Sequence, residues 1–169
     1  MNVTYRDAEI ADAATLDRIF DTTFCDTFGH LYRPDDLNSF LSSFGIADWE
    51  AELASADYAF RIAEADGEPV GYLKLGPFEL PFETDASPLT LDQLYILNPY
   101  HGIGIAHGLM DWALEEARAR GADELYLTVY VDNHRARRFY DRYGFEAVGR
   151  YDFMVGNHAD EDLIMRKVL

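Results

Sequence analysis

The chain has 169 residues and a formal net charge of −17 at pH 7, because 31 acidic residues outnumber 14 lysines and arginines. Such a balance repels the phosphates of nucleic acids and of anionic membrane surfaces, so we expect neither as a partner. The length is that of one ordinary domain, and we expect residues 1–169 to form a single domain with a normal core.

The sequence carries no signal for export or for a membrane anchor. No run of 18 apolar residues occurs, and residues 1–13 lack the basic start and apolar centre of a signal peptide, so we expect a cytoplasmic location. Cys25 is the only cysteine, which excludes an internal disulfide, and its neighbours Phe24 and Phe28 favour a place in the core. The histidines are scattered without the spacing of a ligand set, so we expect no metal.

The first part of the chain predicts a strand, several helices and a hairpin. Asp12 is placed to cap the first helix, whose apolar residues share one face. Asp66 and Gly67 stand between two strand patterns, as in a tight hairpin turn. In chain order, the strand covers 2–8, the helical patterns begin after Asp12 and at 33–44 and 47–56, and the hairpin covers 58–75.

The second part alternates strands with amphipathic helices. Gly121 is expected to end the longer helix, and Asn133 to cap the shorter one, which Gly144 closes. In chain order, we expect a strand at 89–97, a helix from Ile105 to Gly121, a strand at 124–131, a helix from Asn133 to Gly144, and two last strands within 145–156 and 161–169.

Gly102 and Gly104 stand directly before the longer helix. Glycine is unfavourable at the start of a helix relative to alanine, so two glycines here indicate that exposed backbone has a purpose at this point. A strand that runs through such a turn into a helix N-terminus presents free N–H groups and the positive end of the helix dipole to one point, which suits a phosphate. The turn lacks the Gly-Lys-Ser/Thr ending of a P-loop, and His107 stands where the fingerprint GxGxxG needs a glycine. A plain connection between two elements is the alternative.

Charge is distributed unevenly along the chain. Residues 1–73 hold 15 acidic residues against 4 basic ones, a net charge of 4 − 15 = −11. These acids are interleaved with aromatic side chains, a combination that suits a flexible organic cation, and we single out Phe28, Tyr32 and Trp49 as candidate substrate contacts. Four arginines crowd into residues 135–142 and suit an anion. The alternative is that the acidic surface serves only solubility or a salty habitat.

Two motifs together resemble the paired signatures of the GNAT superfamily of N-acyltransferases. The first, a Q/R-x-x-G-x-G/A turn, reads here as residues 101–106. The second, an N-x-x-A-x-x-FY-x-x-x-GF helix, reads as residues 133–145, and the order of the predicted elements also fits. His101 departs from the family pattern, which has glutamine or arginine at that position.

The resemblance implies a mixed α/β (α+β) fold, with a mostly antiparallel central sheet of about seven strands flanked by about four helices. Two central strands would be splayed to hold acyl-CoA, and acetyl-CoA would be the co-substrate. Main chain of residues 94–96 would pair with the pantetheine arm, and the N–H groups of residues 102–106 would take the pyrophosphate. The cofactor-binding residues implied are Leu94, Tyr95, Ile96, His101, Gly102, Ile103, Gly104, Ile105, Ala106, Asn133, Arg135 and Ala136.

The same resemblance implies a catalytic role for Tyr140. A neutral phenol with a pKa near 10 can donate its proton to a leaving thiolate whose conjugate acid has a pKa near 8.5. Core packing is the alternative for this side chain. Asp92 is the candidate that binds the ammonium and passes its proton on, directly or through water. We expect direct attack by the amine, because Cys25 lies outside both motifs.

The acceptor is predicted from a further resemblance. Residues 20–28, the acidic segment through Trp49 and the ending DLIMRKVL resemble bacterial polyamine (spermidine/spermine) N-acetyltransferases. This implies transfer of an acetyl group to a primary amine of a small cation. The alternatives are acetylation of a protein or peptide amine or of an amino-sugar and, in a different class, an acyl-CoA sensor without turnover. Relatives often dimerise, so a homodimer is a further expectation.

Overall fold

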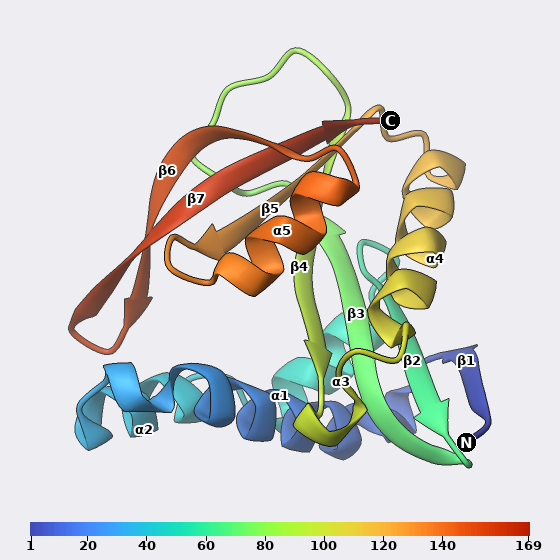
Figure 1. The fold of residues 1–169 in the computed structure, drawn as a ribbon, viewed down its shortest axis with the longest axis vertical. Coiled ribbons are helices and arrows are strands. Elements are labelled where there is room, and N and C mark those ends of the chain that lie inside the picture. Colours follow the sequence, from blue (N-terminus) through green and yellow to red (C-terminus); the bar gives the residue numbers. More distant parts are fainter.

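The structure, a computed structural model, describes residues 1–169 and joins seven strands in one sheet, in the order β1-β2-β3-β4-β5-β7-β6 (Figure 1). The strands are β1 Val3–Asp7, β2 Ala59–Ala65, β3 Glu68–Pro77, β4 Pro88–Ile96, β5 Glu124–Tyr130, β6 Glu146–Val155 and β7 His158–Val168. The helices are α1 Ala13–Phe28, α2 Pro34–Ser42, α3 Ile46–Ala54, α4 Ile105–Ala119 and α5 His134–Arg142. This is the mostly antiparallel mixed fold that was expected, with five α-helices where about four were predicted.

The centre of the sheet opens between β4 and β5. These strands form the only parallel pair, and they are paired over three positions alone, from Pro88 opposite Glu124 to Thr90 opposite Tyr126. Beyond Thr90 they diverge, as Figure 1 shows, and β4 keeps its partner β3 while β5 keeps β7. The predicted splay of two central strands is therefore confirmed, and it leaves one edge of β4 without a strand partner.

Two hydrophobic clusters cover the two faces of the sheet. On one face α4 packs its apolar stripe, with Leu109 and Met110 fully buried, against β2, β3 and β4. On the other face α1 and α3 gather aromatic side chains around Trp49 and Tyr72. Helices therefore cover both faces of the sheet near the opening. Figure 1 shows α5 beside β5 and α1 below β4.

Local sequence signals explain the turn between β2 and β3. Asp66 (φ 49°) and Gly67 (φ 85°) both adopt the left-handed conformation that a two-residue hairpin turn requires, which confirms the predicted hairpin.

Cys25 is exposed rather than buried, because it lies on the side of α1 opposite the apolar stripe. The expectation of a core thiol is therefore wrong.

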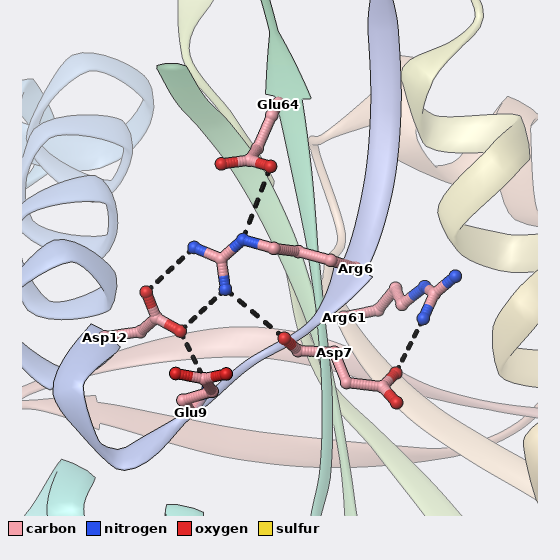
Figure 2. Close-up of polar contacts among 6 residues, drawn as sticks. All are labelled: Arg6, Asp7, Glu9, Asp12, Arg61 and Glu64. Atoms are coloured by element: carbon pink, nitrogen blue, oxygen red, sulfur yellow. Dashed lines mark hydrogen bonds and ion pairs between the residues drawn. The ribbon is translucent and has the colours of Figure 1, made fainter. Parts of the chain in front are cut away.

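A charged network fixes the start of α1 against the sheet (Figure 2). The guanidinium of Arg6 on β1 donates to both carboxylate oxygens of Asp12, at 2.8 and 2.9 Å, and its Nε lies 3.3 Å from Glu64 on β2. Asp12 also accepts a hydrogen bond from the backbone N–H of Glu9, at 2.7 Å. The Arg6 hydrogen bonds lower the pKa of Asp12 below its ordinary value, against the opposing effect of burial. The network sets the direction in which α1 leaves the sheet.

Candidate active site

The opening between β4 and β5 contains two adjoining cavities. The larger, here called the large cleft, measures about 580 Å³ and extends from the end of β4 over the glycine turn to α5. The smaller, here called the small cavity, measures about 140 Å³ and lies toward α1 and the β6–β7 hairpin. Six residues line both: Phe28, Leu94, Tyr95, Asn133, Ala136 and Tyr140. A molecule bound in one would therefore meet a molecule bound in the other at these side chains.

The glycine turn presents bare backbone to the large cleft. Gly102 (φ 79°) and Gly104 (φ 92°) are left-handed, and a Cβ on either would meet nothing within 4 Å. None of the backbone N–H groups from Gly102 to Ala106 donates a hydrogen bond within the protein. Several free donors at the N-terminus of α4 form a cradle that suits a phosphate. Gly108 serves a different purpose, because its Cβ would lie 2.3 Å from the Tyr5 hydroxyl on β1.

His101 links the glycine turn to α5. Its Nε2 donates to the carbonyl of Ile96 at 2.6 Å, and its Nδ1 accepts from the guanidinium of Arg135 at 2.6 Å. This pair of bonds requires the ring proton on Nε2 and a bare Nδ1. Both His101 and Arg135 line the large cleft. The histidine that departs from the family pattern thus holds an arginine at the wall of the cleft.

The other residues predicted to bind the cofactor lie in the large cleft, with one exception. Leu94, Tyr95 and Ile96 line it from the unpaired edge of β4. Asn133 caps α5 by accepting from the Ala136 N–H at 3.3 Å, as predicted, and both residues line the cleft. Its side-chain amide nitrogen has no partner in the protein and is free to donate into the cleft.

Ile103 is the exception, since its side chain is 49% exposed and lines neither cavity. Its backbone N–H is the part that belongs to the cradle described above.

Tyr140 lies at the junction of the two cavities. Only 8% of it is exposed, and its hydroxyl makes no hydrogen bond within the protein. Burial raises its pKa above the ordinary value of 10, which keeps the phenol neutral and able to donate. A buried, uncommitted proton donor next to an open cavity is suited to general acid chemistry.

Asp92 sits on a β-bulge in β4. Lys74 pairs with Gln93 and Leu75 with Leu91, so Asp92 is the extra residue. Its carboxylate lies over Gly76, where a Cβ would come within 2.5 Å of Oδ2. The Lys74 ammonium lies 4.0 Å away and is itself held by Glu52 at 2.6 Å.

The surroundings of Asp92 make it a usable base. Its side chain keeps 27% of its exposure and lines the small cavity. Burial raises its pKa to about 7; Lys74 opposes that rise, and Glu52 adds to it. A carboxylate with a pKa near neutrality can accept a proton, which an ordinary aspartate does poorly.

The small cavity also holds two carboxylates that the sequence analysis did not single out, Asp160 and Asp162 on β7. Each is only 6% exposed. Asp160 accepts a hydrogen bond from the Tyr32 hydroxyl and lies 3.1 Å from Nε2 of His158. Burial raises the pKa of Asp162 to about 7, and the charge of Asp160 adds to the rise. Their i, i+2 spacing, which places both on one face of a strand, was the available signal.

The predicted substrate contacts divide in the structure. Phe28 and Tyr32 line the small cavity, as the hypothesis requires. Trp49 does not: it is 1% exposed, packs in the core against Phe20, and donates its indole N–H to Asp17 at 2.9 Å. The assignment of Trp49 to the substrate is corrected accordingly, because its ring is needed between α1, α3 and the sheet.

The acids of the N-terminal segment also lie elsewhere than expected. Asp48 caps α3, Glu52 pairs with Lys74, and Asp36 accepts from the β6–β7 turn at Asn157. Asp26 reaches the large cleft, but none of these four lines the small cavity. The negative charge in that cavity comes instead from β4 and β7.

Comparison with known proteins identifies the family. Residues 20–145 match the model of the Acetyltransferase (GNAT) family. An uncharacterised N-acetyltransferase of Lactobacillus delbrueckii subsp. lactis is 30% identical over 87% of this chain and 86% of its own. One from Mycobacterium bovis is 34% identical over 80% of this chain and 84% of its own. The chain belongs to the GNAT family of acetyltransferases, and acetyl-CoA is its co-substrate.

Solved structures share the same fold. PaiA N-acetyltransferase from Thermoplasma acidophilum, solved with coenzyme A, superposes with a TM-score of 0.81 at 22% identity and covers 100% of both chains. YncA, an acetyltransferase from Salmonella typhimurium solved with acetyl-CoA, has a TM-score of 0.74 at 20% identity and covers 100% of this chain and 95% of its own.

None of the helices has the length and apolar character that a membrane span needs. No three potential metal ligands gather at one place.

Proposed function

We propose that this enzyme acetylates a primary amine of a small organic cation, of which a polyamine such as spermidine is the type. The observation that carries the proposal is the small cavity, where Asp92, Asp160 and Asp162 line a space walled mostly by aromatic and apolar side chains. Carboxylates in such surroundings bind an ammonium group favourably. Aromatic rings attract its positive charge and pack against the methylenes attached to it. The neighbouring large cleft, with its N–H cradle, is the proposed place of the acetyl-CoA pyrophosphate.

The proposed chemistry uses Asp92 on β4 and Tyr140 on α5, which both line the small cavity. Acetyl-CoA, when bound, supplies an acyl group attached to a thiolate leaving group. Asp92 takes a proton from the substrate ammonium, directly or through water, so that the amine has a free electron pair. The amine attacks the thioester carbonyl carbon, the C–N bond forms as the C–S bond breaks, and Tyr140 donates its proton to the departing sulfur. The proton that the nitrogen loses as the amide forms restores the phenol. Attack is direct, because Cys25 lines neither cavity and no other thiol exists in the chain.

Other acceptors make distinguishable demands on the small cavity. A peptide amine or an amino-sugar needs one carboxylate near the reacting nitrogen, and gains little from the other two. A phosphonate-bearing amine would be repelled. This last comparison is informative because the aminoalkylphosphonate N-acetyltransferase of Salmonella typhimurium is 33% identical over 57% of this chain. A sensor that binds acyl-CoA without turnover would need neither Asp92 nor Tyr140.

The test is a panel of acceptors assayed for release of free CoA thiol under one condition. The panel contains spermidine, glucosamine, a lysine-bearing peptide, a peptide with a free N-terminus and an aminoalkylphosphonate. We expect the highest kcat/KM for spermidine and the lowest for the phosphonate, since charge complementarity decides between them. Turnover of another member of the panel with no activity on spermidine would contradict the proposed acceptor. If no member of the panel causes release of free thiol, the result would favour a sensor that binds acyl-CoA without turnover.

A further inference from the structure

We propose that Asp160 and Asp162 form a subsite for a second positive charge of the acceptor, so that the enzyme selects amines that carry two ammonium groups separated by a methylene chain. The inference rests on the proposed function and deepens it, because it names the residues that choose among cationic amines. Neither residue lies within the two family motifs.

The first support is that Asp162 has no cationic partner in the protein, whereas Asp160 is contacted by His158 at 3.1 Å. Asp162 is more than nine-tenths buried, lines the small cavity and forms no ion pair. The Thr128 hydroxyl on β5 is the one neighbour that favours its charged form. None of the basic side chains reaches Asp162: His158 contacts Asp160, Lys74 pairs with Glu52, Arg150 with Glu161 and Arg166 with Glu124. A buried carboxylate without a counter-ion is unfavourable, and an incoming cation would relieve that cost.

The second support is the aromatic surroundings. Asp162 lies opposite Tyr130 on β5, and Asp160 lies opposite Phe153 on β6, so each carboxylate has an aromatic side chain beside it on the same face of the sheet. Tyr32 adds a third ring and fixes Asp160 by its hydrogen bond. Rings beside carboxylates suit an alkylammonium, because the rings attract the charge and pack against the methylenes. No group of three histidine, cysteine or acidic side chains that could hold a metal ion gathers at this place.

The third support is the separation from the reacting centre. Asp92 is on β4, whereas Asp162 is on β7, and β5 lies between these two strands. Two strand spacings are roughly 10 Å, and the splay adds to this. An amine held at Asp92 would therefore reach Asp162 only through a chain of several methylenes. A monoamine held at Asp92 would leave Asp162 without a cationic partner.

The experiment compares linear diamines of increasing length with the monoamines of equal chain length, in the full-length protein. The wild type is expected to prefer the longer diamines over their monoamines by at least about tenfold in kcat/KM, mainly through KM. Asp162→Asn should collapse that ratio toward one while the chain keeps its fold. Glu161→Gln is the matched control: it makes the same charge change on the same strand, on an exposed side chain paired with Arg150, and should keep the ratio.

The outcomes separate the two proposals. If diamines and monoamines turn over equally in the wild type, or if Asp162→Asn keeps the preference, the subsite is refuted while the acetyltransferase proposal stands. If no amine turns over, the proposed acceptor class fails, and calorimetry with spermidine tests the subsite directly. Spermidine binding that Asp162→Asn weakens at least about tenfold would support the subsite, and binding unchanged by Asp162→Asn would refute it.

Discussion

Asp92 combines a buried position with access to the small cavity, and this combination should appear in the pH dependence of turnover. Because burial raises its pKa to about 7, the carboxyl is protonated below that pH and cannot accept a proton. We expect kcat/KM for spermidine to rise with pH through about 7, in a range where the free amine stays charged.

The assignment of this titration is tested with two variants, since the pKa of Asp162 also lies at about 7. Asp162→Asn should keep a rise near pH 7, whereas Asp92→Asn should lower kcat and remove the rise. A pH profile of Asp92→Asn that matches the wild type would show that another group or water alone takes the proton.

At the level of the elements, the glycine turn and its helix provide the sharpest comparison. Gly104 and Gly121 flank α4 at its two ends, both are left-handed, and a Cβ on either would meet nothing within 4 Å. Valine at either position should cost about 1–2 kcal/mol of stability, because a branched residue resists this conformation. Only Gly104 faces the large cleft, so Gly104→Val should weaken acetyl-CoA binding by more than about tenfold, whereas Gly121→Val should not.

Calorimetric titration of acetyl-CoA into both variants makes the measurement. Equal acetyl-CoA affinities for the two variants would contradict the assignment of the pyrophosphate to the glycine turn.

The elements that could be predicted are those whose signals are local. The hairpin at Asp66 and Gly67, the α5 cap at Asn133 and the helix ends at Gly121 and Gly144 each depend on a few neighbouring residues, and each is found where the sequence indicates. The residues of the large cleft that belong to the family motifs could be predicted, because the residues of each motif stand close together in the sequence at fixed spacing.

The acceptor cavity could not be predicted in the same way. Asp92, Asp160 and Asp162 meet only because β4, β5 and β7 are neighbours in the sheet, and strand order is not a local property. The acidic, aromatic-rich N-terminal segment indicated a cation through its composition, but Asp48 caps α3 and Glu52 pairs with Lys74, and neither lines the small cavity. Trp49 was misplaced for a related reason, since an aromatic side chain on a helix face has the same pattern whether it faces the core or a ligand.

For the molecule as a whole, the network at the start of α1 predicts how stability depends on pH. The pKa of Asp12 is lowered in the folded chain, so its contribution is complete above the unfolded pKa of about 3.9 and is lost as the pH falls through the folded value. Asp12→Asn should lower the free energy of unfolding by about 1–2 kcal/mol at pH 7, and by progressively less below pH 4.

Asp7→Asn is the control, because it breaks the other arginine pair of Figure 2, Arg61 with Asp7, whose carboxylate side chain is 77% exposed. Such an exposed pair should contribute little. Denaturant unfolding at several pH values measures both variants. A loss for Asp12→Asn that stays constant down to pH 3 would contradict the assigned ion pair.

The proposed mechanism depends on Tyr140 as the proton donor at the junction of the two cavities, and removal of its hydroxyl is the most direct test. Tyr140→Phe keeps the ring and its packing, so acetyl-CoA affinity should change little while kcat falls by about 10² to 10⁴. Tyr143→Phe, which removes a phenol from the same segment but outside both cavities, should retain turnover. Near-normal kcat for Tyr140→Phe at saturating acetyl-CoA and spermidine would contradict the account and assign Tyr140 to the core.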